Sequence, residues 1–512
     1  MKSTKYDPKL LLIPFGIYTL ISAVFLNISA YPFCVGLSFT GKLLFSLFSA
    51  AILTLMYSLY ARYGTAYLYI FLGICLVTAV YCSFRFSVNL CPDEEGRVLI
   101  SNWIYRYGTL PTGYEYALID PDPNLDPYHD YTSPNWGYDY AFTPYLPSIL
   151  GALMMRAVSL FTKRQTALLI AARSVNIIGY AVTMIYSVKL SREISDRVWK
   201  LFVMLLIGIP QVLFLSGYLN NDLFSLMSSV MIIYYLVRCH RTDWKTGMCI
   251  GLGISVAVSM LSYYFGYGLI LIATIWSVAD CRASAAKIYE NPKDRTVFII
   301  KKASVVFLTV FLLAGWYFIR NAVIYSGDVF GIRSQHHCAE LYEAAGHEVY
   351  DPPTFADRNA TWKYWFEITL KSLVGIFGYM DKLMDNALYV FYDMLFLAGF
   401  VLYPFSLPER IRKNSTSLPV CIFALFSVVI PLFLSMHRSV TYDFEPQGRY
   451  IISALPAVAF AISSGYGHLD SLISRKRLPE NSFLSVENLI CPVLTVLWSL
   501  ALVNHILPLA VY

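Results

Sequence analysis

A run of three carboxylates directly after an apolar segment is the first place in this chain where side chains could do chemistry. Asp93, Glu94 and Glu95 follow the apolar run 65–86 and open a long loop rich in aromatic residues and proline. A charged side chain costs roughly 2.5 kcal/mol or more at the centre of a bilayer, so carboxylates at a helix exit indicate interfacial chemistry. An ordinary helix start, with Asp93 as the N-cap, explains the same residues and is compatible with that role.

A second acid lies in the turn Asn220-Asn221-Asp222, at the start of the apolar run 222–237. Asn and Asp are common N-cap residues, so helix capping alone accounts for this turn. A functional interpretation of Asp222 requires that this helix end lies on the same side of the membrane as Asp93.

Two arginines lie at the ends of predicted membrane segments. Arg320, in the sequence Trp-Tyr-Phe-Ile-Arg-Asn, has the position of an interfacial anchor. Arg449, in the sequence Glu-Pro-Gln-Gly-Arg-Tyr, lies in the first turn of a predicted helix, where its charge opposes the helix dipole and needs an anionic partner. Phosphate is the natural candidate, because a guanidinium group binds it bidentately.

Two features are candidates for metal binding, and neither is assigned as a site. The loop 120–126 alternates oxygen-bearing residues as the start of a calcium loop does. Leu125 stands where such a loop needs glycine, and Tyr131 stands where it needs glutamate, so a solvated, proline-stiffened loop is favoured. His336 and His337 are interpreted as bystanders rather than metal ligands.

Membrane helices must position these residues. The chain has 512 residues, of which 57% are hydrophobic and 14% are charged, whereas soluble domains carry about 25% charged residues. Apolar runs of about 20 residues recur along its length and predict an all-α polytopic membrane protein. The runs lie near residues 10–33, 42–61, 65–86, 142–161, 167–189, 198–217, 222–237, 247–280, 303–322, 386–405, 418–436, 449–468 and 486–507.

The basic residues indicate which runs cross. Counting every run as a crossing, with 247–280 as two, gives fourteen and separates the N-terminal lysines from the later basic clusters. If 142–161 instead lies along the interface, all these clusters fall on the cytoplasmic side. This predicts thirteen crossings with a cytoplasmic N-terminus, and it puts the polar loops 87–166, 325–385 and 437–448 together on the outer face. The net charge of +6 therefore indicates topology rather than nucleic-acid binding.

The ten cysteines contain no C-x-x-C pair, and most lie inside apolar runs, so they are interpreted as small core residues. Cys91 and Cys338 share the predicted outer face and are the one candidate pair for a disulfide.

Taken together, the polar motifs resemble those of the polytopic GT-C class of glycosyltransferases. The closest likeness is to bacterial members catalogued as a domain of unknown function and related to the protein O-mannosyltransferases. The resemblance covers about residues 85–470 and depends on the order of its motifs: Asp93-Glu94, Asn220-Asn221-Asp222, Arg320-Asn321 with Tyr325-x-Gly327-Asp328, Gly375-x-Phe377-Gly378 and Gln447-Gly448-Arg449-Tyr450. The chain departs from this pattern by two additional N-terminal helices, by Thr143-Pro144-Tyr145-Leu146 in place of a Pro-Pro-Leu-Tyr-like segment, and by having no soluble C-terminal domain.

The resemblance implies that a sugar is moved from a polyprenyl-phosphate-linked donor to an acceptor hydroxyl. The acceptor would be a glycan, a lipid or a protein at the outer face of a bacterial plasma membrane, with membrane lipids as the other contacts. Such a reaction needs one base for the hydroxyl and cationic groups for the departing phosphate. A phosphate leaves without a general acid, so one carboxylate can suffice.

The same resemblance assigns roles to residues of this chain. Asp93 is expected to be the base, Glu94 its acceptor-positioning neighbour and Asp222 a second acid of the site. The donor phosphate is expected to bind Arg449 and Arg320. Substrate positioning is expected from the polar residues beside these groups, which are Asn221, Gln447 and Tyr450. No cofactor is assigned, and a divalent cation is left open.

Four parts make up the predicted organisation. Residues 1–64 form two additional transmembrane helices, and 65–322 form the GT-C-like catalytic module, whose outer catalytic loop 87–166 carries interfacial juxtamembrane helices. Residues 323–385 form a large outer loop, and 386–512 form the C-terminal transmembrane helices.

Two other classes of function fit the sequence less well. A lipid-linked-saccharide flippase or transporter also needs outer arginines and acids, but it should show internal repeats or matching Gly/Pro-broken helices in two halves, which the sequence does not show. A non-catalytic membrane scaffold of the same fold would not need Asp93.

Overall fold

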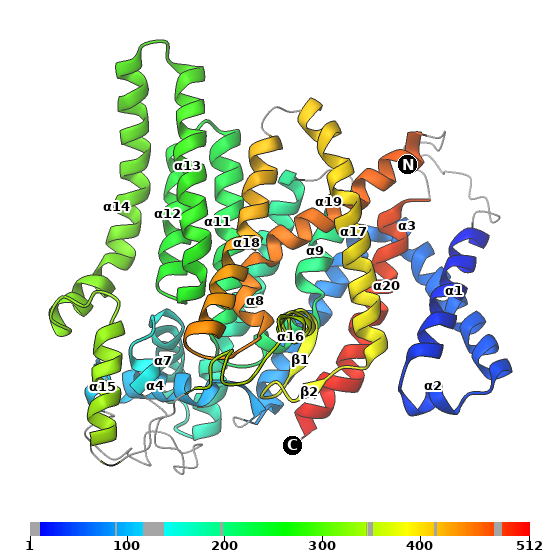
Figure 1. Ribbon diagram of the computed structural model, residues 1–512, viewed down its shortest axis with the longest axis horizontal. Helices are drawn as coiled ribbons and strands as arrows, with labels where there is room; N and C mark the ends of the chain where they lie inside the picture. The colour runs from blue at the N-terminus through cyan, green and yellow to red at the C-terminus, as the bar shows by residue number, and fades with distance from the viewer. Residues whose placement is uncertain are drawn as a thin grey trace.

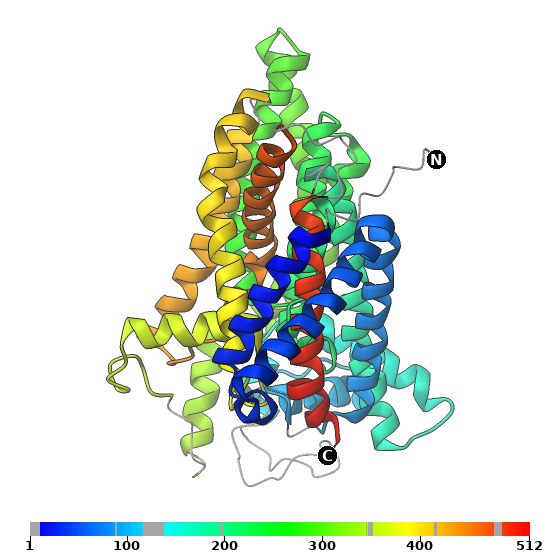
Figure 2. The same ribbon diagram turned by 90° about the vertical axis from the view of Figure 1, so that its right-hand side faces the viewer.

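The computed structural model describes residues 11–87, 90–115, 138–194, 198–344, 346, 352–413, 417–475 and 484–511. The long helices stand side by side as a bundle (Figure 1). Short elements gather at one end, which we call the site face: α4 (Glu94–Tyr107), α6 (Tyr138–Ala141), α7 (Leu146–Ser159), α15 (Ile332–Ala344), α16 (Trp362–Gly375) and the two-stranded sheet of β1 (Ile376–Phe377) and β2 (Lys382–Leu383). The opposite end, where α13 (Tyr267–Ile288) is joined to α14 (Pro292–Ile324), is called the far face (Figure 2).

Within the described residues, nine helices are long and apolar enough to cross a membrane, or ten if one bent pair counts as a single span. The bundle consists of α1 (Leu12–Ile28), α3 (Phe39–Arg85), α8 (Gln165–Ile194), the bent pair α9 (Trp199–Ile207) and α10 (Pro210–Ser216), α11 (Asp222–Arg241), α12 (Thr246–Met260), α13, α14, α17 (Asn386–Lys413), α18 (Ser417–Thr441), α19 (Leu455–Arg475) and α20 (Val486–Ala501). The predicted all-α polytopic membrane protein is confirmed.

Helix α3 is bent at Tyr63, whose φ of −127° and ψ of 26° are not helical. Beyond the bend, Arg85 donates a hydrogen bond to the carbonyl of Ala510, after the end of α20. Tyr31, which lies before α3, is hydrogen-bonded to His505, and His505 is in the same part of the chain as Ala510. Both ends of α3 therefore lie at the site face, as expected if the predicted runs before and after Tyr63 are two crossings. If α3 crosses twice and the shorter α1 and α12 also cross, the ten spans become thirteen; that number stays a prediction.

The segment predicted to lie along the interface contains α7, whose 14 residues extend only about 21 Å. This length is less than the roughly 30 Å of a bilayer's hydrocarbon core. Gly151 of α7 lies against Ser101 of α4 and Ala172 near the start of α8. Helix α7 is thus part of the layer at the site face (Figure 1), and its position along the membrane interface stays a prediction.

The best-buried part of the bundle is formed by α9, α10, the start of α11 and α19. Pro210 at the first position of α10 follows Gly208 and the extended Ile209, and the two helices meet at 56° there. In contrast, only 6% of the apolar window of α14 is buried inside the protein. The central helices therefore carry the turn Asn220-Asn221-Asp222 to the middle of the site face.

Candidate functional site

Asp93 precedes α4 in a left-handed backbone conformation, with φ 62° and ψ −1°. This conformation is uncommon for residues other than glycine, although Asp adopts it more readily than most. The side chain does not cap α4; one carboxylate oxygen accepts a hydrogen bond from Nη1 of Arg449 at 2.6 Å. The N-cap prediction is correct for the position of Asp93 and wrong for its side chain, which faces a cation instead.

Arg449 lies in the 3₁₀-helix η4 (Gly448–Ala454), which leads into α19, and its side chain is 6% exposed. A side chain at Gly448 would collide with the backbone of Leu373 in α16. The Gly448 amide instead donates to the Ser372 hydroxyl at 2.6 Å. Glycine therefore lets η4 approach α16 closely, and this approach places the Arg449 guanidinium beside Asp93.

The first residue of α11, Asp222, has a fully buried side chain whose nearer oxygen lies 3.8 Å from Nη1 of Arg449. Neither carboxylate oxygen has a hydrogen-bond partner in the described part of the chain. A buried ionised carboxylate is strongly unfavourable without a counter-ion. Arg449 is thus shared by two carboxylates that are 129 residues apart in the sequence.

Arg97 is a site residue that the sequence analysis did not single out. It lies four residues after Asp93, one helical turn along α4, and is 4% exposed. Its guanidinium carbon is 5.2 Å from the ring centre of Tyr140 and 5.7 Å from that of Tyr263. A Cβ at residue 96 would collide with the Tyr140 ring, so Gly96 permits this packing. The i, i+4 spacing from Asp93 was the signal available in the sequence.

The protonation state of Asp93 is set by its cationic neighbours. Burial acts to raise its pKa, but the guanidinium groups of Arg449 and Arg97 and a hydrogen bond from Tyr140 outweigh burial and hold the pKa below its ordinary value. For Arg97, burial acts to lower the pKa, and the fields of Tyr140 and Asp93 reverse that effect. Both side chains are therefore charged at neutral pH.

The three predicted positioning residues lie around the same carboxylates. Gln447 accepts a hydrogen bond from Nε of Arg449 and donates one to Glu445 at 3.1 Å. Tyr450 donates to Glu445 and stacks on Phe265, with ring centres 4.5 Å apart. Asn221 is next to Asp222, and its side-chain oxygen is buried without a partner among the described residues. The structure thus brings Asp93, Asp222, Arg449, Asn221, Gln447 and Tyr450 together.

Glu94 occupies a different environment from the one predicted. Its side chain is fully buried and forms a bidentate ion pair with Arg173 of α8, at 2.6 and 2.8 Å. One of its oxygens also accepts from the Leu219 amide at 2.9 Å. Both oxygens are engaged inside the protein, so we correct the acceptor-positioning role of Glu94 to a structural one. It joins α4 to α8 and to the turn before Asp222.

Arg320 also lies elsewhere. It donates to the carbonyls of Pro111 at 2.6 Å and Leu110 at 3.4 Å, and it lies over the Tyr145 ring. No ion pair or hydrogen bond joins it to Asp93 or Arg449 in the described residues. The guanidinium of Arg320 fastens the loop after α4 and is not part of the cluster around Arg449, so nothing in this arrangement supports its predicted phosphate-binding role.

The described residues contain no group of three or more His, Cys, Asp or Glu side chains that could hold a metal ion. Arg449 lies between the two site carboxylates, and a requirement for a divalent cation stays an open prediction. His337 pairs with Glu340 on the surface of α15. The acidic loop 120–126 lies outside the described residues.

Cys91 and Cys338 do not form the disulfide that the sequence allowed. Cys91 belongs to the central hydrophobic cluster, whereas Cys338 belongs to the one under α15, where its thiol donates to the Gly113 carbonyl.

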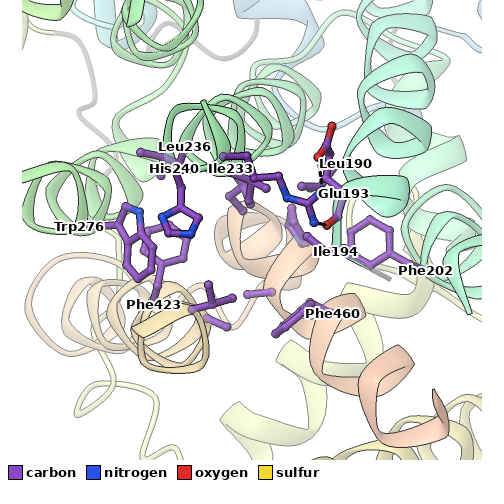
Figure 3. Close-up of a pocket in the computed structure, with 16 residues that line it drawn as sticks. Leu190, Glu193, Ile194, Phe202, Ile233, Leu236, His240, Trp276, Phe423 and Phe460 are labelled. Atoms are coloured by element: carbon purple, nitrogen blue, oxygen red, sulfur yellow. Dashed lines mark hydrogen bonds and ion pairs between the residues drawn. The ribbon is translucent and has the colours of Figure 1, made fainter. Parts of the chain in front are cut away.

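A separate cavity of about 170 Å³ lies at the end of α11 that is toward the far face, and Figure 3 shows the side chains that line it. Apolar side chains from six helices line it, and Glu193, His240 and Arg241 form its polar part. His240 is 18 residues after Asp222 in α11, or about 27 Å along the helix axis. None of the predicted site residues lines this cavity, so the candidate site is the cluster at the opposite end of α11.

Comparison with known proteins gives one family and several distant structures. Residues 128–458, more than half of the chain, match the model of a family described as a predicted membrane protein (DUF2142). This match agrees with the predicted likeness to a family catalogued as a domain of unknown function. A search of curated proteins gives no match.

Among solved structures, apo ArnT from Cupriavidus metallidurans is similar at 12% identity and a TM-score of 0.45, over 81% of this chain and 62% of that chain. The oligosaccharyltransferase of Archaeoglobus fulgidus with a tethered acceptor peptide is similar at 13% identity and a TM-score of 0.47, over 88% of this chain and 55% of that chain. ArnT from the same organism bound to undecaprenyl phosphate is similar at 14% identity and a TM-score of 0.41, over 88% of this chain and 74% of that chain. The chain thus spans less than two thirds of the first two proteins. Similarity at these TM-scores does not establish a shared fold, so the GT-C-like fold stays a prediction.

Proposed function

This chain belongs to the DUF2142 family of predicted membrane proteins, and we propose that it is a glycosyltransferase that uses a polyprenyl-phosphate-linked sugar as donor. One observation carries the proposal: Arg449 is buried between Asp93 and Asp222, at the end of a membrane bundle. Transfer of a sugar from a lipid phosphate to a hydroxyl needs a proton acceptor beside an anion-binding cation. The site supplies both within hydrogen-bonding distance.

In the proposed reaction, the acceptor hydroxyl attacks the anomeric carbon of the donor sugar. The bond from that carbon to the phosphate oxygen breaks, and the lipid phosphate leaves with the bonding electrons. The hydroxyl proton passes to Asp93, and the Arg449 guanidinium stabilises the charge that develops on the phosphate. When a phosphate binds Arg449, it takes over part of the attraction that now holds the Asp93 pKa down, and Asp93 becomes more basic as the donor arrives.

We also propose that the site face is the outer face of a bacterial plasma membrane and that the N-terminus is cytoplasmic. The support is the charge of the far face. The end of α13 and the start of α14, which meet at this face, carry six basic side chains, and short basic segments between membrane helices stay in the cytoplasm. These residues are Arg282, Lys287, Lys293, Arg295, Lys301 and Lys302.

One observation keeps a transporter as a second candidate. The pair α9 and α10 is a broken span with Gly208 and Pro210 at the break, which is a feature of transporters. Transporters built from repeats carry a matching break in the other half, and the described residues contain one such pair. Movement of a lipid-linked sugar between leaflets without release of the sugar would identify this function.

The test is transfer from a panel of radiolabelled undecaprenyl-phosphate-linked sugars by the full chain in liposomes, with release of undecaprenyl phosphate as a readout for any acceptor. Arg449→Lys keeps the charge but loses the planar fork, so we expect at least a tenfold weaker apparent donor affinity. Arg320→Lys is the matched control and should leave the donor affinity unchanged. Unchanged affinity in both Arg449→Lys and Arg449→Ala would refute the phosphate-binding role.

A further inference from the structure

Arg97 is a buried cation that forms no direct ion pair with either of the two site carboxylates. Nη1 of Arg449 lies 2.6 Å from a carboxylate oxygen of Asp93 and 3.8 Å from one of Asp222. The Nε atom of Arg97, in contrast, is buried without a hydrogen-bond partner in the described part of the chain. A buried guanidinium with an unused Nε donor is costly to the fold, and an anion bound there during function would satisfy that donor.

Two aromatic rings hold Arg97 in place. Its guanidinium carbon lies 5.2 Å from the Tyr140 ring centre and 5.7 Å from the Tyr263 ring centre, within the range of cation–π attraction. Cation–π contacts use the face of the guanidinium plane and leave the donors on its edge for hydrogen bonds. Arg97 is thus fixed in position while its Nε donor remains available.

Arg97 and Arg449 act on the same two carboxylates. Both guanidinium groups interact electrostatically with Asp93 and with Asp222. They come from α4 and η4, which are far apart in the sequence, and both are near Asp93: Arg449 donates to it at 2.6 Å, and Arg97 is one helical turn after it. Two guanidinium groups so placed suit a single anion with several acceptor oxygens, such as a phosphodiester, which one bidentate arginine does not saturate.

We infer that Arg97 is a second phosphate-binding residue, which together with Arg449 holds the phosphodiester of the lipid-linked donor. This inference rests on the proposed function for the identity of the donor, and it replaces Arg320 in the phosphate-binding pair. Arg97 contributes hydrogen-bond donors from the side of α4, and Arg449 contributes them from the side of η4.

The experiment measures binding to the full chain in detergent, with undecaprenyl phosphate and with undecaprenol, which lacks the phosphate. Arg97→Gln should raise the Kd for undecaprenyl phosphate at least tenfold and leave that for undecaprenol unchanged. Arg97→Lys keeps the charge without the fork and should give an intermediate Kd. Arg106→Gln, an exposed arginine on the same helix, is the control and should bind as wild type does.

Melting curves without ligand accompany each variant, and Arg97→Lys decides the outcome if Arg97→Gln does not fold. Wild-type affinity for undecaprenyl phosphate in the folded Arg97 variants overturns the inference, and so does an equal loss of undecaprenol binding. If the wild type binds the phosphate lipid through Arg97 but transfers no sugar, the proposed function fails and the inference stands. If the wild type transfers sugar and the Arg97 variants bind the phosphate lipid with the wild-type Kd, the inference fails and the proposed function stands.

Discussion

The substitution Asp93→Asn separates a catalytic role of this residue from a structural one. Asn has nearly the same size as Asp, and it is one of the few residues that tolerate the left-handed backbone found here, with φ 62°. No helix cap is lost, because the Asp93 side chain does not cap α4. We therefore expect the variant to fold.

The cost to stability follows from the contact with Arg449. The Asp93 side chain is 25% exposed and accepts one charged hydrogen bond at 2.6 Å. Hydrogen bonds to charged groups contribute about 1.5–3 kcal/mol. In the variant, the Asn oxygen still accepts from Arg449, and Asp222 still lies 3.8 Å from that guanidinium. We therefore expect a loss of about 1–2 kcal/mol in the free energy of unfolding.

The effect on transfer should be much larger. Removing a general base lowers the rate by about 10²-fold to 10⁴-fold. The assay is sugar transfer in liposomes, with a melting curve for each variant. Glu115→Gln is the control, because Glu115 is a carboxylate of the same loop region that accepts from Thr112. A folded Asp93→Asn protein with wild-type transfer refutes the role of Asp93 as the general base. A variant that unfolds and loses transfer refutes the expectation that Asp93 contributes only about 1–2 kcal/mol to stability.

Three further predictions follow from the environment of this site. Glu94→Gln leaves Arg173 as a buried charge without its counter-ion, so the free energy of unfolding should fall by about 3–5 kcal/mol, measured as a lower melting temperature than that of Asp93→Asn. Gly448→Ala pushes a methyl group against the backbone of α16; melting should show a loss of about 1–3 kcal/mol, and the donor Kd should rise as Arg449 moves. Because neighbouring guanidinium groups outweigh burial and lower the Asp93 pKa, its charge stabilises the fold above the unfolded-state pKa of about 3.9, and this contribution is lost as the pH falls through the folded-state pKa. The difference in melting temperature between wild type and Asp93→Asn should therefore shrink as the pH falls below about 4; a difference that does not shrink there would contradict the stabilising charge of Asp93.

Sequence reasoning singled out most of the residues that the structure brings together in the candidate site, because polar residues at the ends of apolar runs are few. It failed where a side chain had more than one possible direction. Glu94 follows Asp93 directly, yet successive helical residues point about 100° apart, so one carboxylate faces the site and the other faces Arg173. Arg320 has the composition of an anion-binding residue, but its guanidinium found backbone carbonyls within reach.

The sequence by itself determined that this chain is a helical membrane protein, because apolar length and basic loops act locally and need no partner. It also determined that acids and arginines end several helices. Only the tertiary structure decided which of them meet. Asp93 and Arg449 are 356 residues apart, and their contact depends on the close approach of η4 to α16 and on the anchoring of α4 to α8. A charge left in the bundle must find its counter-ion through packing, and no local pattern specifies that choice.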